Sequence, residues 1–92
     1  MSTPIAQAID TVEQAKAGLE QGRSQVETTL TQVQQALHQQ LEALDAAIAL
    51  RCTGKIDEAI QTAVQALAAA CEEASTMLDQ ERAKLESVLS LM

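Results

Sequence analysis

Apolar residues recur along this chain with a period of eleven, in two stretches that flank Gly54. Eleven residues make three helical turns at about 3.67 residues per turn, so a stripe of this period runs almost straight along an α-helix. In the first stretch the repeating positions are Leu30, Val33, Leu37, Leu41, Leu44, Ile48 and Cys52. In the second they are Ile56, Ile60, Ala63, Leu67, Cys71, Ala74, Leu78, Arg82, Leu85 and Leu89. This pattern predicts two long amphipathic helices.

The ends of these helices have their own sequence signals. Thr3 is suited to cap the first helix, and Pro4 fits its first position, where no backbone N–H is needed. Gly54 can adopt the left-handed conformation that closes a helix, which predicts a turn there. The predicted organisation is a single domain of residues 1–92, with a helix over about 4–51, a turn at 52–54 and a helix over about 55–91.

Gly18 and Gly22 weaken the first predicted helix. Each glycine costs about 1 kcal/mol relative to alanine in a helix interior, and the apolar stripe changes register between them. A continuous helix is the favoured interpretation, because good helix formers occupy the positions between and just after the two glycines. The alternative is a bend at this point.

A hairpin folded about Thr53 pairs residues whose numbers sum to about 107. This rule sets Leu41 and Leu67 in one core layer and brings Arg82 near Glu20 or Glu27. The same rule predicts that three branched residues extend past the end of the second helix without cover. They are Ile5, Ile9 and Val12.

The chain contains no aromatic residue, so its core consists of aliphatic side chains, cysteine and methionine. A lone two-helix hairpin buries one stripe per helix, and most helical stability comes from such packing. We therefore expect an all-α antiparallel hairpin that dimerises into a four-helix bundle. The predicted interaction residues are Ile5, Ile9, Val12, Leu19, Val26, Leu30, Val33, Leu37, Leu41, Leu44, Ile48, Ile56, Ile60, Leu67, Leu78, Leu85 and Leu89, with Gly54 at the turn.

The balance of charge limits the possible partners. Thirteen acidic residues outnumber six basic ones, which gives a net charge of −7. Nucleic acids and anionic membranes attract basic surfaces, so neither is an expected partner. The expected partner is a protein, either a second copy or a similar helical chain. The first residues lack a conventional signal peptide, which favours the cytoplasm, with export by a route without a cleaved signal as the alternative.

Candidate chemistry is sparse. His38 and Cys71 form the one pairing that predicts a thiol-based redox or metal module, because a Cys–His pair can activate a thiolate. Two ligands do not complete a metal site, and no CxxC or HxxxH spacing is present. Cys71 occupies a stripe position and is expected to be buried, whereas Cys52 is expected near the turn. We predict no catalytic residue, no metal and no cofactor.

In length and predicted architecture the chain resembles the small helical hairpins of the WXG100 class, which are substrates and partners of type VII secretion. Gly54, within Cys52-Thr53-Gly54, matches the turn glycine of that class, while the tryptophan and the C-terminal tyrosine motif are absent. The resemblance implies a secreted partner protein that dimerises into a four-helix assembly. The stripes also resemble coiled-coil segments of scaffold proteins.

These observations predict a non-enzymatic interaction module that works as a homodimer or as half of a heterodimer. Its mechanism would be the burial of a Leu/Ile/Val stripe against the matching stripe of a partner. The WXG100-like secreted protein and the redox or metal module are the alternatives.

Overall fold

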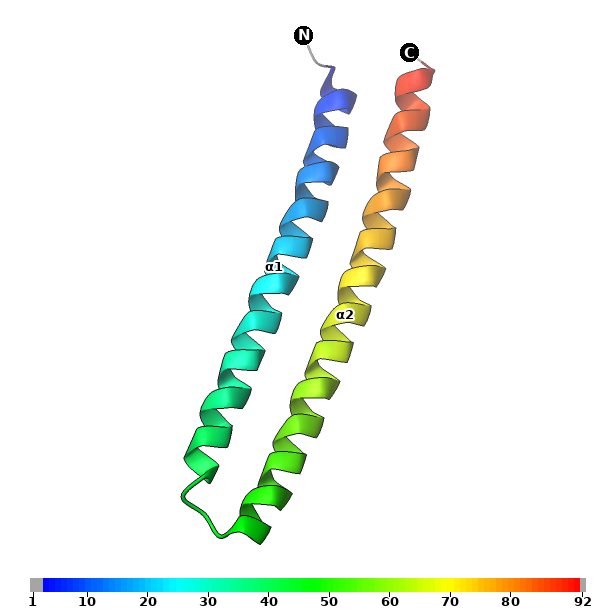
Figure 1. The fold of residues 1–92 in the computed structure, drawn as a ribbon. Helices are drawn as coiled ribbons and strands as arrows, with labels where there is room; N and C mark the ends of the chain where they lie inside the picture. Colours follow the sequence, from blue (N-terminus) through cyan, green and yellow to red (C-terminus); the bar gives the residue numbers. More distant parts are fainter. Residues whose placement is uncertain (1–2, 92) are drawn as a thin grey trace. The chain divides into compact units, whose positions relative to one another are not determined.

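The computed structural model describes residues 3–91, which form two α-helices. Helix α1 spans Pro4–Leu41 and helix α2 spans Ala46–Ser90. Figure 1 shows the two helices running in opposite directions and joined by a short connection. The fold is therefore an all-α helical hairpin, as the apolar periodicity predicted.

Contacts within the chain divide it into two units. The termini unit comprises Met1–Gly22 and Ala69–Met92, and the turn unit comprises Arg23–Ala68. In each unit a segment of α1 packs antiparallel to a segment of α2.

The start of α1 follows the capping signals in the sequence. The backbone N–H of Ala6 donates to Thr3 Oγ1 at 3.0 Å, and that of Gln7 donates to the Thr3 carbonyl oxygen at 3.0 Å. Pro4 is the first helical residue, so its missing N–H leaves no bond unmade. Helix α1 continues through Gly18 and Gly22, which confirms the continuous interpretation.

The connection between the helices lies at residues 42–45, so the predicted turn at 52–54 is wrong. Two tight backbone bonds end α1: Glu42 N–H to the Gln39 oxygen at 3.3 Å, and Leu44 N–H to the Leu41 oxygen at 3.0 Å. Asp45 then caps α2, because its Oδ1 accepts the N–H of Ala47 at 3.1 Å. The Asp45 cap and these backbone bonds thus pair several terminal backbone groups of both helices without a glycine.

Gly54 lies inside α2 and plays no part in the turn. No glycine among the described residues has a positive φ angle, so the left-handed conformation expected of Gly54 is absent. A Cβ added at Gly54 would meet no atom within 4 Å. The backbone there needs no glycine.

The contacts between the helices also correct the predicted pairing. In the termini unit Glu13 pairs with Arg82, and in the turn unit His38 contacts Asp57. In both cases the residue numbers sum to 95 instead of about 107, because the turn comes earlier in the chain. Arg82 therefore pairs with Glu13 and not with Glu20 or Glu27.

The earlier turn changes which apolar residues lie at the same level. In the termini unit Ile5, Ile9 and Val12 are half-buried, so the prediction that they extend past α2 without cover is wrong. In the turn unit Leu41 and Leu67 are displaced from a common level by about 13 residues, roughly 20 Å along a helix. The predicted Leu41–Leu67 layer is therefore also wrong.

The core is thin. Cys71, at 5% exposure, is the one buried residue among those described. Ala63 of the second apolar stretch is exposed, but the large aliphatic members of that stretch are half-buried between the helices. They are Ile56, Ile60, Leu67, Leu78, Leu85 and Leu89.

Candidate interaction surface

The side of α1 that faces α2 in the turn unit is largely polar. Six positions of α1 are half-buried there, and four of them carry polar or charged side chains. The six are Arg23, Glu27, Leu30, Gln34, His38 and Leu41. Because 23 and 34, 27 and 38, and 30 and 41 are each eleven apart, this polar seam has the same period as the apolar stripe.

The apolar stripe of α1 lies beside this seam and is exposed. Val26 and Val33 are each 44% exposed and Leu37 is 39% exposed. At 100° per residue, the centre of the apolar positions is rotated by about 60° around α1 from the centre of the half-buried positions. We call Val26, Val33 and Leu37 the α1 stripe. The helix thus turns its polar flank to α2 and leaves this stripe about two-fifths exposed.

A polar cluster of Gln34, His38 and Asp57 holds the two helices together in the turn unit. Asp57 Oδ1 accepts a hydrogen bond from Gln34 Nε2 at 2.7 Å and lies 2.8 Å from His38 Nε2. The hydrogen bond from Gln34, followed by that from His38, lowers the pKa of the Asp57 carboxyl below its ordinary value. Because Gln34 and His38 are one turn apart, Asp57 connects to two successive turns of α1.

The polar cluster also shows which residues of α1 and α2 lie on the same side of the turn unit. His38 lies to one side of the centre of the six half-buried positions of α1, and Asp57 of α2 lies on the same side because it contacts His38. Residues that are rotated the opposite way around each helix, away from the positions that face the other helix, therefore lie together on the other side of the turn unit. On that side lie the α1 stripe and three exposed alanines of α2, namely Ala59, Ala63 and Ala66. Together we call these six residues the apolar face.

Two hollows lie on α2 in the turn unit. A shallow one of about 520 Å³ follows the apolar face and is lined by Lys55, Glu58, Ala59, Thr62, Ala63 and Ala66. A larger one of about 980 Å³ lies near the turn and is lined by Leu41, Ile48, Leu50, Arg51, Cys52, Gly54, Lys55, Ile56 and Glu58. Both are open surface hollows lined by aliphatic, polar and charged side chains.

Cations near the turn are weakly engaged. Arg51 makes no ion pair among the described residues. Lys55 Nζ is 3.9 Å from Glu58 Oε2, and both side chains are mostly exposed. Such a pair contributes little in water, so Arg51 and Lys55 are available to a partner.

Ion pairs join the helices in the termini unit. Lys16 pairs with Asp79, and Arg82 Nη2 lies 2.8 Å from Glu13 Oε1. Arg82 Nε also donates to Glu86 Oε1 at 2.9 Å. The bond to Glu86, and then the charge of Glu13, raise the pKa of Arg82, which keeps the guanidinium charged. Arg82 is therefore a bridging residue between the two helices.

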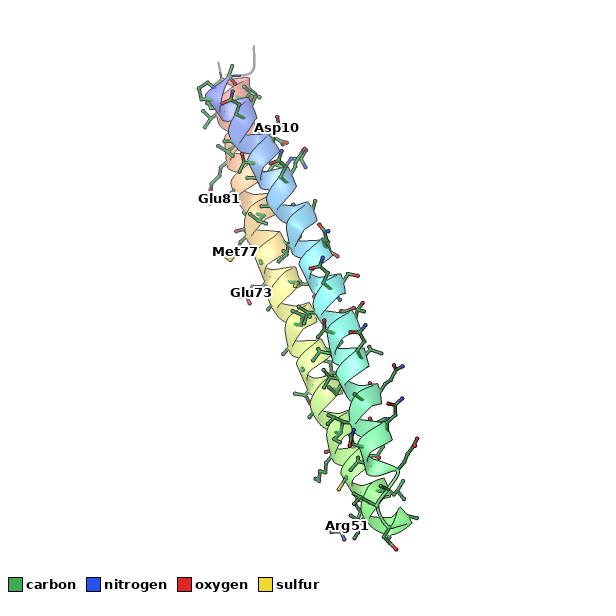
Figure 2. The ribbon with its side chains drawn as sticks, turned by 90° about the vertical axis from the view of Figure 1, so that its left-hand side faces the viewer. Asp10, Arg51, Glu73, Met77 and Glu81 are labelled. Atoms are coloured by element: carbon green, nitrogen blue, oxygen red, sulfur yellow. The ribbon has the colours of Figure 1, made fainter. Side chains whose placement is uncertain are left out.

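The outer side of α2 in the termini unit carries an acidic group with an apolar residue at its centre. Figure 2 shows Glu73, Met77 and Glu81 projecting to one side of α2, each one turn from the next. Met77 is 62% exposed. Glu81 pairs with Lys84 at 3.2 Å, whereas Glu73 makes no ion pair among the described residues. This surface is apolar at its centre and negative at its edges.

The predicted interaction residues divide into two groups. Half-buried in the hairpin are Ile5, Ile9, Val12, Leu19, Leu30, Leu41, Ile56, Ile60, Leu67, Leu78, Leu85 and Leu89. Exposed are Val26, Val33, Leu37, Leu44 and Ile48. Sequence reasoning missed the polar cluster, although the eleven-residue spacing of Glu27 and His38 was a signal for a second, polar stripe on α1.

The residues proposed for redox or metal chemistry lie in different surroundings. His38 is engaged with Asp57, and Cys71 is buried in the termini unit. Both cysteines are free thiols, and Cys52 is half-buried. Residues 3–91 contain no group of three or more histidine, cysteine or acidic side chains placed to hold a metal ion.

Comparison with known proteins identifies no relative. No family model matches the chain, and neither a curated protein nor a solved structure matches it. Over the part of the chain described here, neither helix is both long enough and apolar enough to cross a membrane.

Proposed function

We propose that this chain is a non-enzymatic protein–protein interaction module that buries its apolar face against the helices of a partner. The observation that carries the proposal is the exposure of the α1 stripe in the turn unit, where none of the described residues is fully buried. Burial gains about 0.8 kcal/mol per CH₂ group, so covering three half-exposed branched side chains contributes several kcal/mol. The partner is a second copy or a similar helical chain, which completes a helical bundle.

The distribution of charge supports a helical partner for the apolar face. Residues 28–41 on α1 and 59–71 on α2 contain no Asp, Glu, Lys or Arg. An interface centred on these segments buries no charged side chain, which would otherwise be costly. The remaining acidic residues keep the module soluble and disfavour partners of matching charge at the rim.

The test is a double substitution in the α1 stripe, Val33→Gln with Leu37→Gln. The matched control is Gln32→Ala with Gln35→Ala, at exposed positions of the same helix segment. We expect the wild-type chain and the control to sediment as dimers at micromolar concentration, and the stripe variant to sediment as a monomer. Circular dichroism at the same concentration checks that the helices persist. A wild-type chain that stays monomeric at every concentration would contradict the proposal.

A further inference from the structure

We propose that the partner is a second copy of this chain, and that Val33 and Leu37 on α1 of each copy insert into the shallow hollow on α2 of the other. The two turn units are related by a two-fold axis parallel to the helices, so both turns lie at the same end. This inference rests on the proposed function and specifies its partner and register. Every residue that forms these contacts belongs to the turn unit.

The shallow hollow on α2 has the spacing of two successive holes for the side chains of a facing helix. In knobs-into-holes packing, a side chain of one helix inserts between four residues of the other, at positions i, i+3, i+4 and i+7. Two such sets line the hollow of about 520 Å³, and they overlap by two residues. The sets are Ala59, Thr62, Ala63 and Ala66, and Lys55, Glu58, Ala59 and Thr62. The centres of the two holes therefore lie between positions 62 and 63 and between positions 58 and 59.

Two residues of the α1 stripe lie at the levels of these holes. His38 contacts Asp57, so residues of α1 and α2 in the turn unit are level where their numbers sum to about 95. A two-fold axis parallel to the helices leaves every level unchanged, so the same sum holds between α1 of one copy and α2 of the other. Val33 is then level with position 62, and Leu37 is level with position 58. Each of these side chains thus meets one hole.

The two surfaces are complementary in size. Val33 is 44% exposed and Leu37 is 39% exposed, while the alanines of the apolar face are exposed on the same side of the turn unit. The proposed axis brings the α1 stripe of each copy onto the alanines of the other. Bulky side chains in the hollow make dispersion contacts that an empty hollow lacks. Packing of stripe on stripe would instead set alanine against alanine and leave the hollow unfilled.

The distribution of charge permits this packing. The segment 28–41 of α1, which contains both inserted residues, has no Asp, Glu, Lys or Arg. Lys55 and Glu58 line one end of the hollow, and their side chains are 85% and 75% exposed. The residues of α1 at their levels are Gln40 and Leu37, so no like charges meet. The aliphatic part of Lys55 can cover Leu37 of the second copy while its ammonium group stays in water.

The area required is modest. A standard interface buries about 800 Å² on each partner. The chain exposes 6772 Å² in total, so such an interface would use roughly an eighth of its surface. A two-fold axis forms each contact twice, so both hollows are filled in one dimer.

Cysteine crosslinking between two different chains tests which helices meet. Both chains carry Cys52→Ser and Cys71→Ala, and one also carries Val33→Cys while the other carries Ala63→Cys. Mild oxidation of the mixture should join the two different chains, since the paired positions are in contact and a disulfide requires Cα atoms within about 7 Å. The Val33→Cys chain alone should stay unjoined, because the two α1 helices lie diagonally opposite in the proposed dimer. In the control mixture Gln61→Cys replaces Ala63→Cys and places the thiol on the opposite side of α2, where no crosslink should form.

Filling the hollow tests the packing separately from general hydrophobicity. Ala63→Leu adds exposed apolar surface to the hairpin, which would strengthen a dimer held by unspecific apolar contact. The proposed packing predicts the opposite, a dissociation constant at least about tenfold higher, because the added side chain overlaps Val33 of the second copy. Adding Val33→Ala to the same chain should restore the wild-type value, because the leucine then takes the space of the valine. Gln61→Leu, on the opposite side of α2, is the control and should leave the dissociation constant unchanged.

These outcomes separate the two proposals. If the wild-type chain dimerises, and Val33→Gln with Leu37→Gln dissociates it, the proposed function stands. In that dimer, absence of the crosslink between Val33→Cys and Ala63→Cys, or tighter association of the Ala63→Leu chain, would overturn the proposed packing alone. A monomeric wild-type chain would overturn both.

Discussion

His38 Nε2 lies 2.8 Å from Asp57 Oδ1, and this contact sets the level at which α1 and α2 pack in the turn unit. Gln34, one turn earlier on α1, donates to the same carboxylate oxygen at 2.7 Å. A shift of α2 by one turn along α1 would break both bonds at once. The polar cluster therefore favours the observed register of the two helices in the turn unit.

Replacement of Asp57 by Ala should destabilise the hairpin at neutral pH, because Gln34 and His38 lose their common acceptor. The pKa of Asp57 is lowered in the folded state, so its contribution is complete above the ordinary carboxyl pKa. It is lost as the pH falls through the lowered pKa. Urea unfolding of wild type and variant should differ at pH 7 and converge in strong acid. Glu58→Ala, at an exposed position, is the control, and an equal effect there would contradict the role of Asp57.

Gly54→Ala should stabilise the protein by about 0.5–1 kcal/mol, because Gly54 is helical and an added Cβ meets no atom within 4 Å. Thermal unfolding at fixed protein concentration measures the effect. A turn at Gly54 would require a conformation that alanine rarely adopts, and the same substitution would then destabilise. The sign of the change therefore distinguishes a connection at 42–45 from one at 52–54.

Leu30 and Leu67 should be energetically coupled, because both are half-buried and nearly level in the turn unit. Each single substitution by alanine should cost about 2 kcal/mol, at the lower end of the range for leucine, since neither site is fully buried. A double-mutant cycle should give a coupling of at least about 0.5 kcal/mol for this pair. For Leu41 and Leu67 the effects of the two substitutions on the free energy of unfolding should add. A coupling of equal size for this pair would show that the two residues share a core layer.

The two thiols should react at different rates in the folded protein. Cys71 is 5% exposed, whereas Cys52 is half-buried beside the hollow near the turn. A thiol reagent should therefore modify Cys52 much faster than Cys71, and the two rates should converge in denaturant. Mass spectrometry of single-cysteine variants gives each rate. Rapid labelling of Cys71 in the native state would show that the seam opens readily.

Much of the fold could be predicted from the sequence. The eleven-residue repeat correctly indicated two helices, Thr3 and Pro4 correctly indicated the start of α1, and Cys71 was correctly placed in the core. These features depend on local spacing and on contacts between neighbouring residues. Such information is present in a single sequence.

The turn could not be located by the same reasoning, because Leu41, Leu44 and Ile48 continue the repeat straight through it. Periodicity therefore gave no break where the chain reverses. The cap supplied by Asp45 was the available signal, and Gly54 was the stronger but incorrect one. Because the turn was predicted too late in the chain, every predicted pairing between the helices was shifted. This shift explains the wrong predicted partners of Arg82 and Leu41.

The rotation of α1 also required the structure. The sequence indicates an apolar stripe but not whether it faces α2 or another chain. The half-buried positions of α1, together with the contacts of Gln34 and His38 with Asp57, establish that the polar flank faces α2. The exposed Val33 is the consequence, and it is the basis for the proposed interaction.

Sedimentation equilibrium of the wild-type chain, over a range of concentrations around 1–100 µM, tests the central claim that the hairpin associates through its apolar face. Micromolar or tighter affinity corresponds to a free energy of association of about −8 kcal/mol or lower, which an interface of standard size can supply. We predict about twice the monomer mass, with dissociation on dilution and a melting temperature that rises with concentration. A monomer mass at all concentrations, with a cooperative melt independent of concentration, would contradict the account.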